Sequence, residues 1–296
     1  MPRMIELHTN RPELNGFFGT WVVKEPISMI VDVGPATSAG NLLDSLADLG
    51  VETIDYILIT HIHLDHAGGL AAVLGRYPEA RVVCHKKAVA HLVEPSRLWA
   101  GSLQVLGEMA EAYGPPERVA EEVLVPHDEA RIPGLRVLET PGHAPHHISF
   151  SYKGHLFAGE AGGVYFDLDG ADYLRPATPP RFDFHVSMKS VETLMALEDQ
   201  VLCYAHFGSA ESSHRMLARF KAQLLRWRDI LEKELETDPS VSAAVCTERL
   251  LGKDPELGNL PLIPREMRSR ERFFLENSVK GFVEYLRASA DGKGRP

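Results

Sequence analysis

One short loop carries four side chains that can bind a metal ion. The chain reads THIHLDHAGG over residues 60–69, directly after the apolar run IDYILI. His61 and His63 are two residues apart where a strand is expected to end, so their side chains can point the same way. Asp65 and His66 follow where the chain turns into a helix. Imidazole nitrogens together with a carboxylate suit zinc, manganese or iron, so the loop predicts a metal site.

The elements around this loop alternate between strands and helices. Apolar runs predict strands near residues 20–25, 28–34, 54–60 and 80–85. Leucine spacing and terminal glycines predict helices over 41–50 and 68–78, with further helices inside 86–112. From residue 119 four β-type segments follow, and then a helix over 187–200 leads into a strand over 201–208. We therefore expect an α/β fold in which two sheets pack together with helices outside.

The remaining residues, 209–296, have a helical pattern. Apolar positions such as Leu217, Phe220, Leu224, Trp227 and Leu231 recur every three or four residues, as one buried helical face requires. We expect two domains, 1–208 and an all-helical C-terminal extension, 209–296. The extension could be a packed cap without chemistry, or it could wall or gate the active site.

The loop of residues 61–66 has the pattern H-x-H-x-D-H and resembles the signature of the metallo-β-lactamase superfamily. The resemblance extends from about residue 15 to 208. It implies an αββα sandwich with the metal ions at one edge of the two sheets.

Three later residues resemble the other metal ligands of that family. His143 follows an apolar strand and a Pro-Gly turn, Glu160 follows a strand and a glycine, and His206 ends the last predicted strand. The resemblance implies two divalent metal ions per chain, with zinc expected and manganese or iron as alternatives. It assigns the first ion to His61, His63 and His143, the second to Asp65, His66 and His206, and a position between the two ions to Glu160.

Two features of these later ligands leave alternatives open. Glu160 stands where the family normally has aspartate, and its longer side chain could bridge both ions or bind only one. His146 and His147 lie close to His143 in sequence and could be mistaken for it. We expect His147 to open the next strand and His146 to line the pocket or support a ligand.

The resemblance implies metal-assisted hydrolysis. A metal-bound hydroxide would be the nucleophile, and Asp65 would orient it and pass its proton to the leaving group. The local pattern is similar to the lactonase and glyoxalase II branch, so we expect an ester, lactone or thioester of a small molecule as substrate. The alternatives are a phosphodiesterase of the same fold and a non-enzymatic metal-binding sensor or interaction protein.

Residues 172–185, DYLRPATPPRFDFH, form a Pro-rich segment that follows Glu160 closely. Long irregular loops often border active sites. We therefore expect Tyr165, Tyr173 and Arg175, together with His146, to contact the substrate, although an ordinary surface loop fits the pattern equally well.

Composition limits the partners. The formal net charge of −10 argues against nucleic acid. The first residues lack a signal-peptide pattern and no stretch approaches the roughly 20 apolar residues that span a bilayer, so we expect a cytoplasmic protein that does not bind membranes. Cys84, Cys203 and Cys246 are widely spaced, and we expect buried thiols. The apolar helical faces could also pack on a second subunit, so a homodimer is compatible with the sequence.

Overall fold

The computed structural model describes residues 1–9, 11–168 and 170–290. Contacts between residues divide the chain into two compact units, each assembled from separate segments. Unit 1 comprises Met1–Glu139, His146–Gly159 and Ala205–Phe207, and unit 2 comprises Thr140–Pro145, Glu160–Tyr204 and Gly208–Pro296. The units are discontinuous in sequence, whereas the predicted domain boundary after residue 208 is a single cut. That boundary stays a prediction, and residues 291–296 of the predicted extension lie outside the described part.

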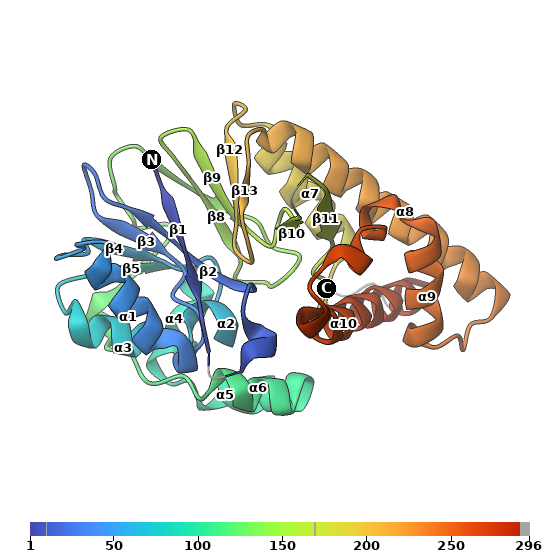
Figure 1. The fold of residues 1–296 in the computed structure, drawn as a ribbon, viewed down its shortest axis with the longest axis horizontal. Coiled ribbons are helices and arrows are strands. Elements are labelled where there is room, and N and C mark those ends of the chain that lie inside the picture. The colour runs from blue at the N-terminus through green and yellow to red at the C-terminus, as the bar shows by residue number, and fades with distance from the viewer. Residues whose placement is uncertain (10, 169, 291–296) are drawn as a thin grey trace. The chain divides into compact units, whose positions relative to one another are not determined.

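A six-stranded sheet forms the centre of unit 1 (Figure 1). Its strands follow chain order: β1 (Arg3–Leu7), β2 (Phe18–Val23), β3 (Met29–Val31), β4 (Tyr56–Leu58), β5 (Arg81–Cys84) and β6 (Leu124–Pro126). The first three strands pair antiparallel, and β3 to β6 pair parallel. Because parallel strands end at the same edge of a sheet, the residues after β3, β4, β5 and β6 lie at one edge.

The helices of unit 1 connect the strands of this sheet. They are α1 (Ala39–Asp48), α2 (Leu64–Ala67), α3 (Leu70–Arg76), α4 (Val89–Val93), α5 (Ser96–Leu106) and α6 (Glu108–Tyr113), with 3-10 turns at Pro12–Leu14, Ala36–Ser38, Lys86–Ala88 and Glu121–Val123. In Figure 1, α1 and α3 lie together along the lower side of the sheet. Leu42 and Leu46 of α1 are fully buried, which is the apolar face that the leucine spacing predicts.

Three further strands complete unit 1. They pair antiparallel in the order β7 (Leu135–Glu139), β8 (Ile148–Tyr152) and β9 (His155–Gly159). The ring of Trp21 on β2 lies 6.1 Å from that of Phe157 on β9, so these strands pack against the six-stranded sheet. The amide of Ile148 donates to the carbonyl of Thr60 at 2.8 Å and joins the start of β8 to the end of β4.

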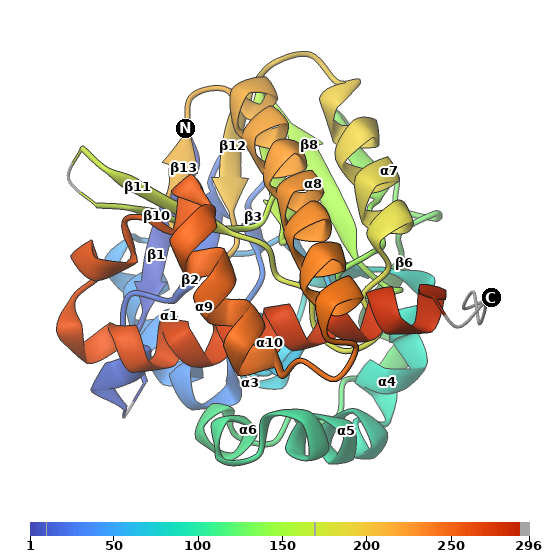
Figure 2. The same cartoon turned by 90° about the vertical axis from the view of Figure 1, so that its right-hand side faces the viewer.

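Unit 2 is mainly helical. Its strands form two hairpins, β10 (Val164–Asp167) with β11 (Asp172–Arg175), and β12 (Val201–Tyr204) with β13 (Ser209–Ala210). Its helices are α7 (Phe184–Met195), α8 (Ser213–Thr237), α9 (Ala243–Lys253) and α10 (Arg265–Ala290), with 3-10 turns at Pro255–Leu257 and Leu260–Leu262. Figure 2 shows α7 beside α8, and α10 crossing α8 and α9. The apolar face predicted for the extension is confirmed, since Leu217, Leu224, Trp227 and Leu231 of α8 are fully buried.

The structure differs from the predicted elements in three places. Strand β1 was not expected, because its sequence RMIEL mixes charged and apolar residues as an edge strand does. Residues 172–175 belong to the β10–β11 hairpin, so the irregular segment is shorter than predicted and ends where α7 begins at Phe184. Strand β13 lies within the range predicted as all helical. Among the described residues, no helix combines the length and apolar character needed to cross a membrane.

Candidate metal centre

The histidine loop follows β4 and is held tightly by its neighbours in unit 1. His63 is the N-cap position of α2 and has an extended backbone, and the chain is helical at Asp65 and His66. The carbonyl of His66 accepts from the amide of Val33 at 2.8 Å, which ties α2 to the end of β3. A Cβ at residue 68 would overlap the backbone, so glycine is required there for this close approach.

Five of the seven predicted ligands belong to unit 1, and their donor atoms lie close together. The Nε2 atom of His61 and the Nδ1 atom of His63 lie 3.0 Å apart. Asp65 Oδ2 lies 3.5 Å from Nε2 of His66 and 3.7 Å from Nε2 of His206. Ligand atoms bound to one tetrahedral zinc at about 2.0–2.1 Å are separated by roughly 3–3.5 Å. The loop and His206 therefore form two neighbouring donor groups whose spacing fits metal ions.

Each of three histidines has its second ring nitrogen beside an oxygen atom. Nδ1 of His66 lies 2.9 Å from Asp32 Oδ2, Nδ1 of His61 lies 3.1 Å from Thr60 Oγ1, and Nδ1 of His206 lies 3.3 Å from the carbonyl of Phe17. Metal-binding histidines are typically oriented in this way, with one N–H donating to a carboxylate or carbonyl and the other nitrogen directed at the ion. The donor set and its orientation both fit metal binding.

Asp32 contacts the histidine loop, and the sequence did not indicate it as a candidate site residue. Its carboxylate accepts from the amide of Thr60 at 2.8 Å and from the Thr60 hydroxyl at 2.8 Å, in addition to its contact with His66. The residue is 2% exposed and has a φ of 56°, a left-handed conformation that aspartate adopts more readily than most residues. The available signal was an acidic residue at the end of the apolar run SMIVDVG.

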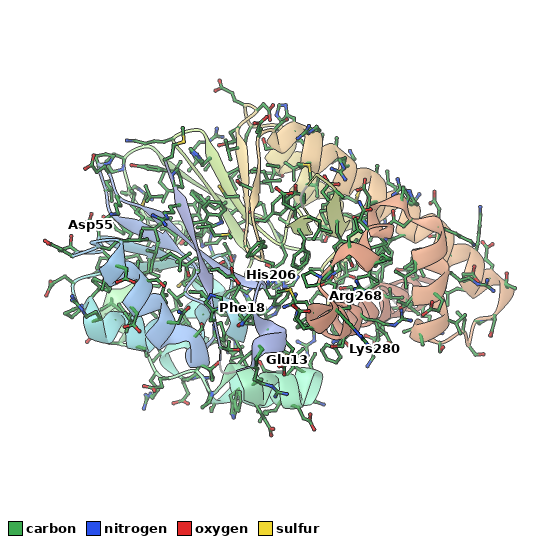
Figure 3. All side chains as sticks on the ribbon, in the orientation of Figure 1. Glu13, Phe18, Asp55, His206, Arg268 and Lys280 are labelled. Atoms are coloured by element: carbon green, nitrogen blue, oxygen red, sulfur yellow. The ribbon has the colours of Figure 1, made fainter. Side chains whose placement is uncertain are left out.

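His206 reaches unit 1 through the short segment Ala205–Phe207. Its ring stacks on that of Phe17, with centroids 4.2 Å apart, and it is 4% exposed. Figure 3 labels His206 in the interior and Asp55 at the outer edge of unit 1. Stacking and the carbonyl contact fix the ring plane, so Nε2 of His206 is directed toward Asp65.

Unit 2 contains the remaining two predicted ligands, His143 and Glu160. Nε2 of His143 lies 3.8 Å from Glu160 Oε1, while Nδ1 lies 3.0 Å from the carbonyl oxygen of Ala177. Both side chains are largely buried, with 9% and 2% exposed. His143 thus follows the same rule as the histidines of unit 1 and, like His206, has a backbone carbonyl as its orienting partner.

The turn that carries His143 is anchored on α7. The hydroxyl of Ser190 donates to the carbonyl of Pro141 at 2.6 Å. Gly142 has a φ of 133°, and a Cβ there would overlap Ser187, so only glycine fits. A cavity of about 10 Å³, the size of one water molecule, is lined by residues of unit 2 that include Thr140, His143, Glu160, Thr178 and Ser190.

His146 and His147 both lie beside the histidine loop in unit 1. The ring of His146 is 6.2 Å from that of His61 and 5.9 Å from that of His63, and its place in a substrate pocket stays a prediction. His147 directly precedes β8, as predicted, and its fully buried ring lies 5.2 Å from that of His61. A Cβ at Gly159 would overlap the His147 ring. Sequence reasoning did not foresee this proximity of His147 to the ligands.

The three predicted substrate residues of unit 2 have internal contacts. The ring of Tyr165 stacks on that of Tyr204 at 4.8 Å, and burial raises the pKa of its hydroxyl. Burial also raises the pKa of Tyr173, which is fully inaccessible. Arg175 is 2% exposed, and its guanidinium forms an ion pair with Glu271 of α10. Their contact with substrate stays a prediction.

A second histidine cluster lies at the same edge of the six-stranded sheet. His85 follows β5 and His127 follows β6, and their rings stack 4.4 Å apart. The Nδ1 atoms accept from the amides of Lys87 and Lys86, so each neutral ring carries its proton on Nε2. Nε2 of His127 lies 2.8 Å from Glu139 Oε1. Parallel rings with protonated Nε2 atoms suit a hydrogen-bonded cluster better than a shared metal ion.

Comparison with known proteins identifies the family. The model of the metallo-β-lactamase superfamily matches residues 20–206, which include all seven predicted ligands. The chain belongs to the metallo-β-lactamase superfamily. The predicted fold class, an αββα metallo-β-lactamase sandwich with a helical C-terminal extension, is thereby confirmed.

Relatives within the metallo-β-lactamase superfamily include proteins of two kinds. The metallo-β-lactamase fold-containing protein ST1585 of Sulfurisphaera tokodaii is 30% identical over 62% of this chain and 70% of its own length. Its crystal structure superposes with a TM-score of 0.62 at 26% identity, covering 75% of this chain and 86% of that one. The hydroxyacylglutathione hydrolase of Aeromonas hydrophila is 30% identical over 62% of this chain, and the match spans 58% of the hydrolase.

One solved structure also covers the extension. The metallo-β-lactamase family protein TTHA1429 of Thermus thermophilus aligns with 98% of this chain and 94% of its own, with a TM-score of 0.63 and 22% identity. At that identity the match concerns the fold alone. The family and the geometry of the donors together support a metal-binding protein, and the relatives named as hydrolases support a hydrolase.

Proposed function

We propose that the protein is a dinuclear metal-dependent hydrolase of small esters, lactones or thioesters. The observation that carries this proposal is the pair of adjacent donor groups in unit 1, His61 with His63 and Asp65 with His66 and His206. A single structural zinc site would need only one such group. Two groups that share one loop favour two neighbouring ions.

The proposed ligands divide as the family resemblance implies. His61, His63 and His143 would hold one ion, and Asp65, His66 and His206 the other. Glu160 would contact both ions or one of them. Bound there, two divalent ions supply Lewis acidity and lower the pKa of a water from about 15.7 toward 7. Zinc is the proposed metal, with manganese and iron as alternatives.

Asp65 is the proposed catalytic residue. Its Oδ2 lies within 3.7 Å of the Nε2 atoms of both His66 and His206. A carboxylate held in this way can accept a hydrogen bond from the attacking water and then deliver a proton to the leaving oxygen or sulfur. Asp32 supports this role indirectly, because it orients His66.

Two variants test the role of Glu160 as a ligand: one changes the length of its side chain and the other its charge. Glu160→Asp restores the residue that the family normally has, whereas Glu160→Gln removes the charge at constant length. If the carboxylate is a ligand, Glu160→Gln should lower metal occupancy and Glu160→Asp should retain most of it. Unchanged occupancy of both ions in Glu160→Gln, measured by elemental analysis, would remove Glu160 from the ligand set.

The proposed substrate class rests on the relatives named hydroxyacylglutathione hydrolases, whose name describes a thioester of glutathione. The chain's acidic balance, with a formal net charge of −10, favours a small molecule over nucleic acid. We further propose a cytoplasmic protein that does not bind membranes and whose apolar helical faces permit a homodimer.

The direct test is a substrate panel on metal-loaded protein. It should contain an aryl ester, a lactone, a hydroxyacyl thioester of glutathione and an aryl phosphodiester, each assayed beside an Asp65→Asn variant. Turnover of an ester, lactone or thioester that is lost in the variant supports the proposal. Efficient cleavage of the phosphodiester alone would make the protein a phosphodiesterase. No turnover of any member, with metal fully bound, would favour a metal-binding sensor.

A further inference from the structure

The orienting partner of His143 belongs to an irregular segment of unit 2. Residues 176–183 join β11 to α7 without helix or strand, and they include Pro176, Pro179 and Pro180. The carbonyl of Ala177 in this segment lies 3.0 Å from Nδ1 of His143. A backbone carbonyl can be aimed only by the conformation of the chain around it. The orientation of His143 therefore depends on whatever holds this segment.

Helix α10 contacts the segment directly after Ala177. The hydroxyl of Thr178 donates to the carbonyl of Ser278 at 2.5 Å. At Gly281 a Cβ would overlap the carbonyl oxygens of both Thr178 and Pro179, so the two backbones meet where only glycine fits. Thr178 is 1% exposed, which leaves its hydroxyl no access to water as an alternative partner.

The same helix also holds both ends of the segment. At the start, the guanidinium of Arg175 pairs with Glu271, and both are almost fully buried. At the other end, the ring of Phe182 packs on that of Phe282, with centroids 5.0 Å apart. The contacts with α10 thus recur along the whole segment and leave it little freedom to move relative to the helix.

Arg175 links the segment to Glu160 as well. It pairs with Val164 across the β10–β11 hairpin, and its carbonyl oxygen lies 2.8 Å from the position that a Cβ on Gly163 would take. The amide of Gly163 donates to the carbonyl of Glu160 at 3.0 Å, which closes the turn that carries Glu160. Although burial opposes the charged form, the carboxylates of Glu271 and Glu160 help to keep the pKa of Arg175 raised.

We propose that α10 is a positioning element of the metal centre: through Gly281 and Ser278 it fixes the segment of residues 176–183 so that the Ala177 carbonyl selects the tautomer and ring orientation of His143. This inference rests on the proposed function, because it treats His143 as a metal ligand. It gives the C-terminal extension a defined role. The extension acts on the centre through a backbone carbonyl, without supplying a ligand.

Two pairs of variants test the proposal. Gly281→Ala inserts a methyl group between α10 and the segment, and its control is Gly252→Ala in α9, where a Cβ meets nothing within 4 Å. Thr178→Val removes the hydrogen bond to Ser278 at nearly constant volume, and its control is Thr178→Ser, which keeps the hydroxyl. The conservative pair guards against the case in which Gly281→Ala fails to fold.

The first readout is the tautomer of the His143 imidazole in metal-free protein, which long-range ¹H–¹⁵N NMR measures. The wild type and both controls should show a neutral ring protonated on Nδ1. Thr178→Val and Gly281→Ala should shift the ring toward the other tautomer or toward exchange between the two. An unchanged Nδ1–H form in both test variants would overturn the proposal, whether or not the protein binds metal.

The second readout is the affinity of each zinc ion, measured by competition with a chromophoric chelator. The test variants should lower the affinity for one ion by roughly 10–100-fold, the usual effect of losing an orienting contact. Their affinity for the other ion should stay within about threefold of the wild-type value. Wild-type affinity for both ions in the test variants would overturn the positioning role. Failure of the wild type to bind zinc at all would overturn the proposed function itself, so the two failures are distinguishable.

Discussion

The proposed ligands of the two units are held in different ways. Unit 1 contributes four of its five ligands from one loop of six residues, and a buried carboxylate, Asp32, orients one of them. Unit 2 contributes His143 and Glu160 from separate turns, and a backbone carbonyl orients His143. A dense local motif needs only a strand, a turn and one acidic neighbour. Dispersed ligands need their surroundings to be fixed by elements far along the chain, here α7 and α10.

The two units should also differ in how a substitution disturbs the orientation of their ligands. In unit 1 the side chains of Asp32 and Thr60 orient His66 and His61, so a single substitution can remove either group, whereas His206 contacts the carbonyl of Phe17. In unit 2 the orienting group is part of the backbone and can be disturbed only through its packing. The following predictions test that contrast, from the largest expected effect to the smallest.

Asp65→Asn should have the largest effect. The substitution removes the carboxylate that lies between His66 and His206, and with it the proposed proton transfer. Positioned acid–base groups contribute about 10²–10⁴-fold to rate, so kcat for the best substrate of the panel should fall by that factor. The matched control is Asp44→Asn, an exposed carboxylate on α1. A fall of less than tenfold with metal fully bound would remove Asp65 from catalysis.

Asp32→Asn should weaken metal binding, and its effect on folding should be smaller than its effect on metal affinity. Asparagine tolerates the positive φ of 56° but cannot provide the buried negative charge that orients His66. We expect roughly 10–100-fold lower affinity for one ion, measured by chelator competition. Asp55→Asn is the control, because Asp55 is also in unit 1 and its carboxylate accepts from the amide of Ser28. Equal affinities in the two variants would contradict the role of Asp32.

These two residues mark the limit of what could be predicted from the sequence. Asp65 was predictable because it belongs to the same loop of six residues as His61, His63 and His66. Asp32 was not, because its contact with Thr60 and His66 exists only once β3 and β4 pair in parallel. Strands β2 to β5, the histidine loop and the helical extension followed from periodicity and turn residues, whereas β1 and β13 did not. The β10–β11 hairpin and the contacts of α10 depend on packing between distant segments, which periodicity does not encode.

Acid should destabilise unit 1 through the second histidine cluster. Burial and the neighbouring His127 lower the pKa of His85 from 6.5 to about 4. The unfolded chain therefore binds a proton that the folded chain excludes, and this contribution to stability is full above pH 6.5 and lost as the pH falls toward 4. We expect this group to account for about 1 kcal/mol between pH 6.5 and 5.5, from the linkage relation.

The measurement is urea unfolding of metal-free protein at several pH values, with His85→Gln as the comparison. The variant should show a shallower dependence of the unfolding free energy on pH over this interval. His155→Gln, at a partly exposed histidine of β9, is the control and should leave the slope unchanged. Parallel slopes for wild type and His85→Gln would contradict the prediction.

We expect the smallest effect in the rate of thiol labelling, which can be followed for each unit separately. Burial raises the pKa of the Cys84 thiol to about 12 and that of Cys203 further, and all three thiols are buried. Cys84 lies in unit 1, whereas Cys203 and Cys246 lie in unit 2. At pH 8 each thiol should react with a thiol reagent only when its unit opens, so bound metal should slow labelling. Rapid labelling of native protein would show that a thiol is accessible.

The most direct test of the central claim is the elemental metal content per chain of protein purified without added metal, in wild type and in His143→Ala. We predict about two equivalents in the wild type and a clear loss in the variant, because His143 is one of the seven proposed ligands. One equivalent or none in the wild type, even after reconstitution, or two retained in His143→Ala, would contradict a dinuclear centre that has His143 among its ligands.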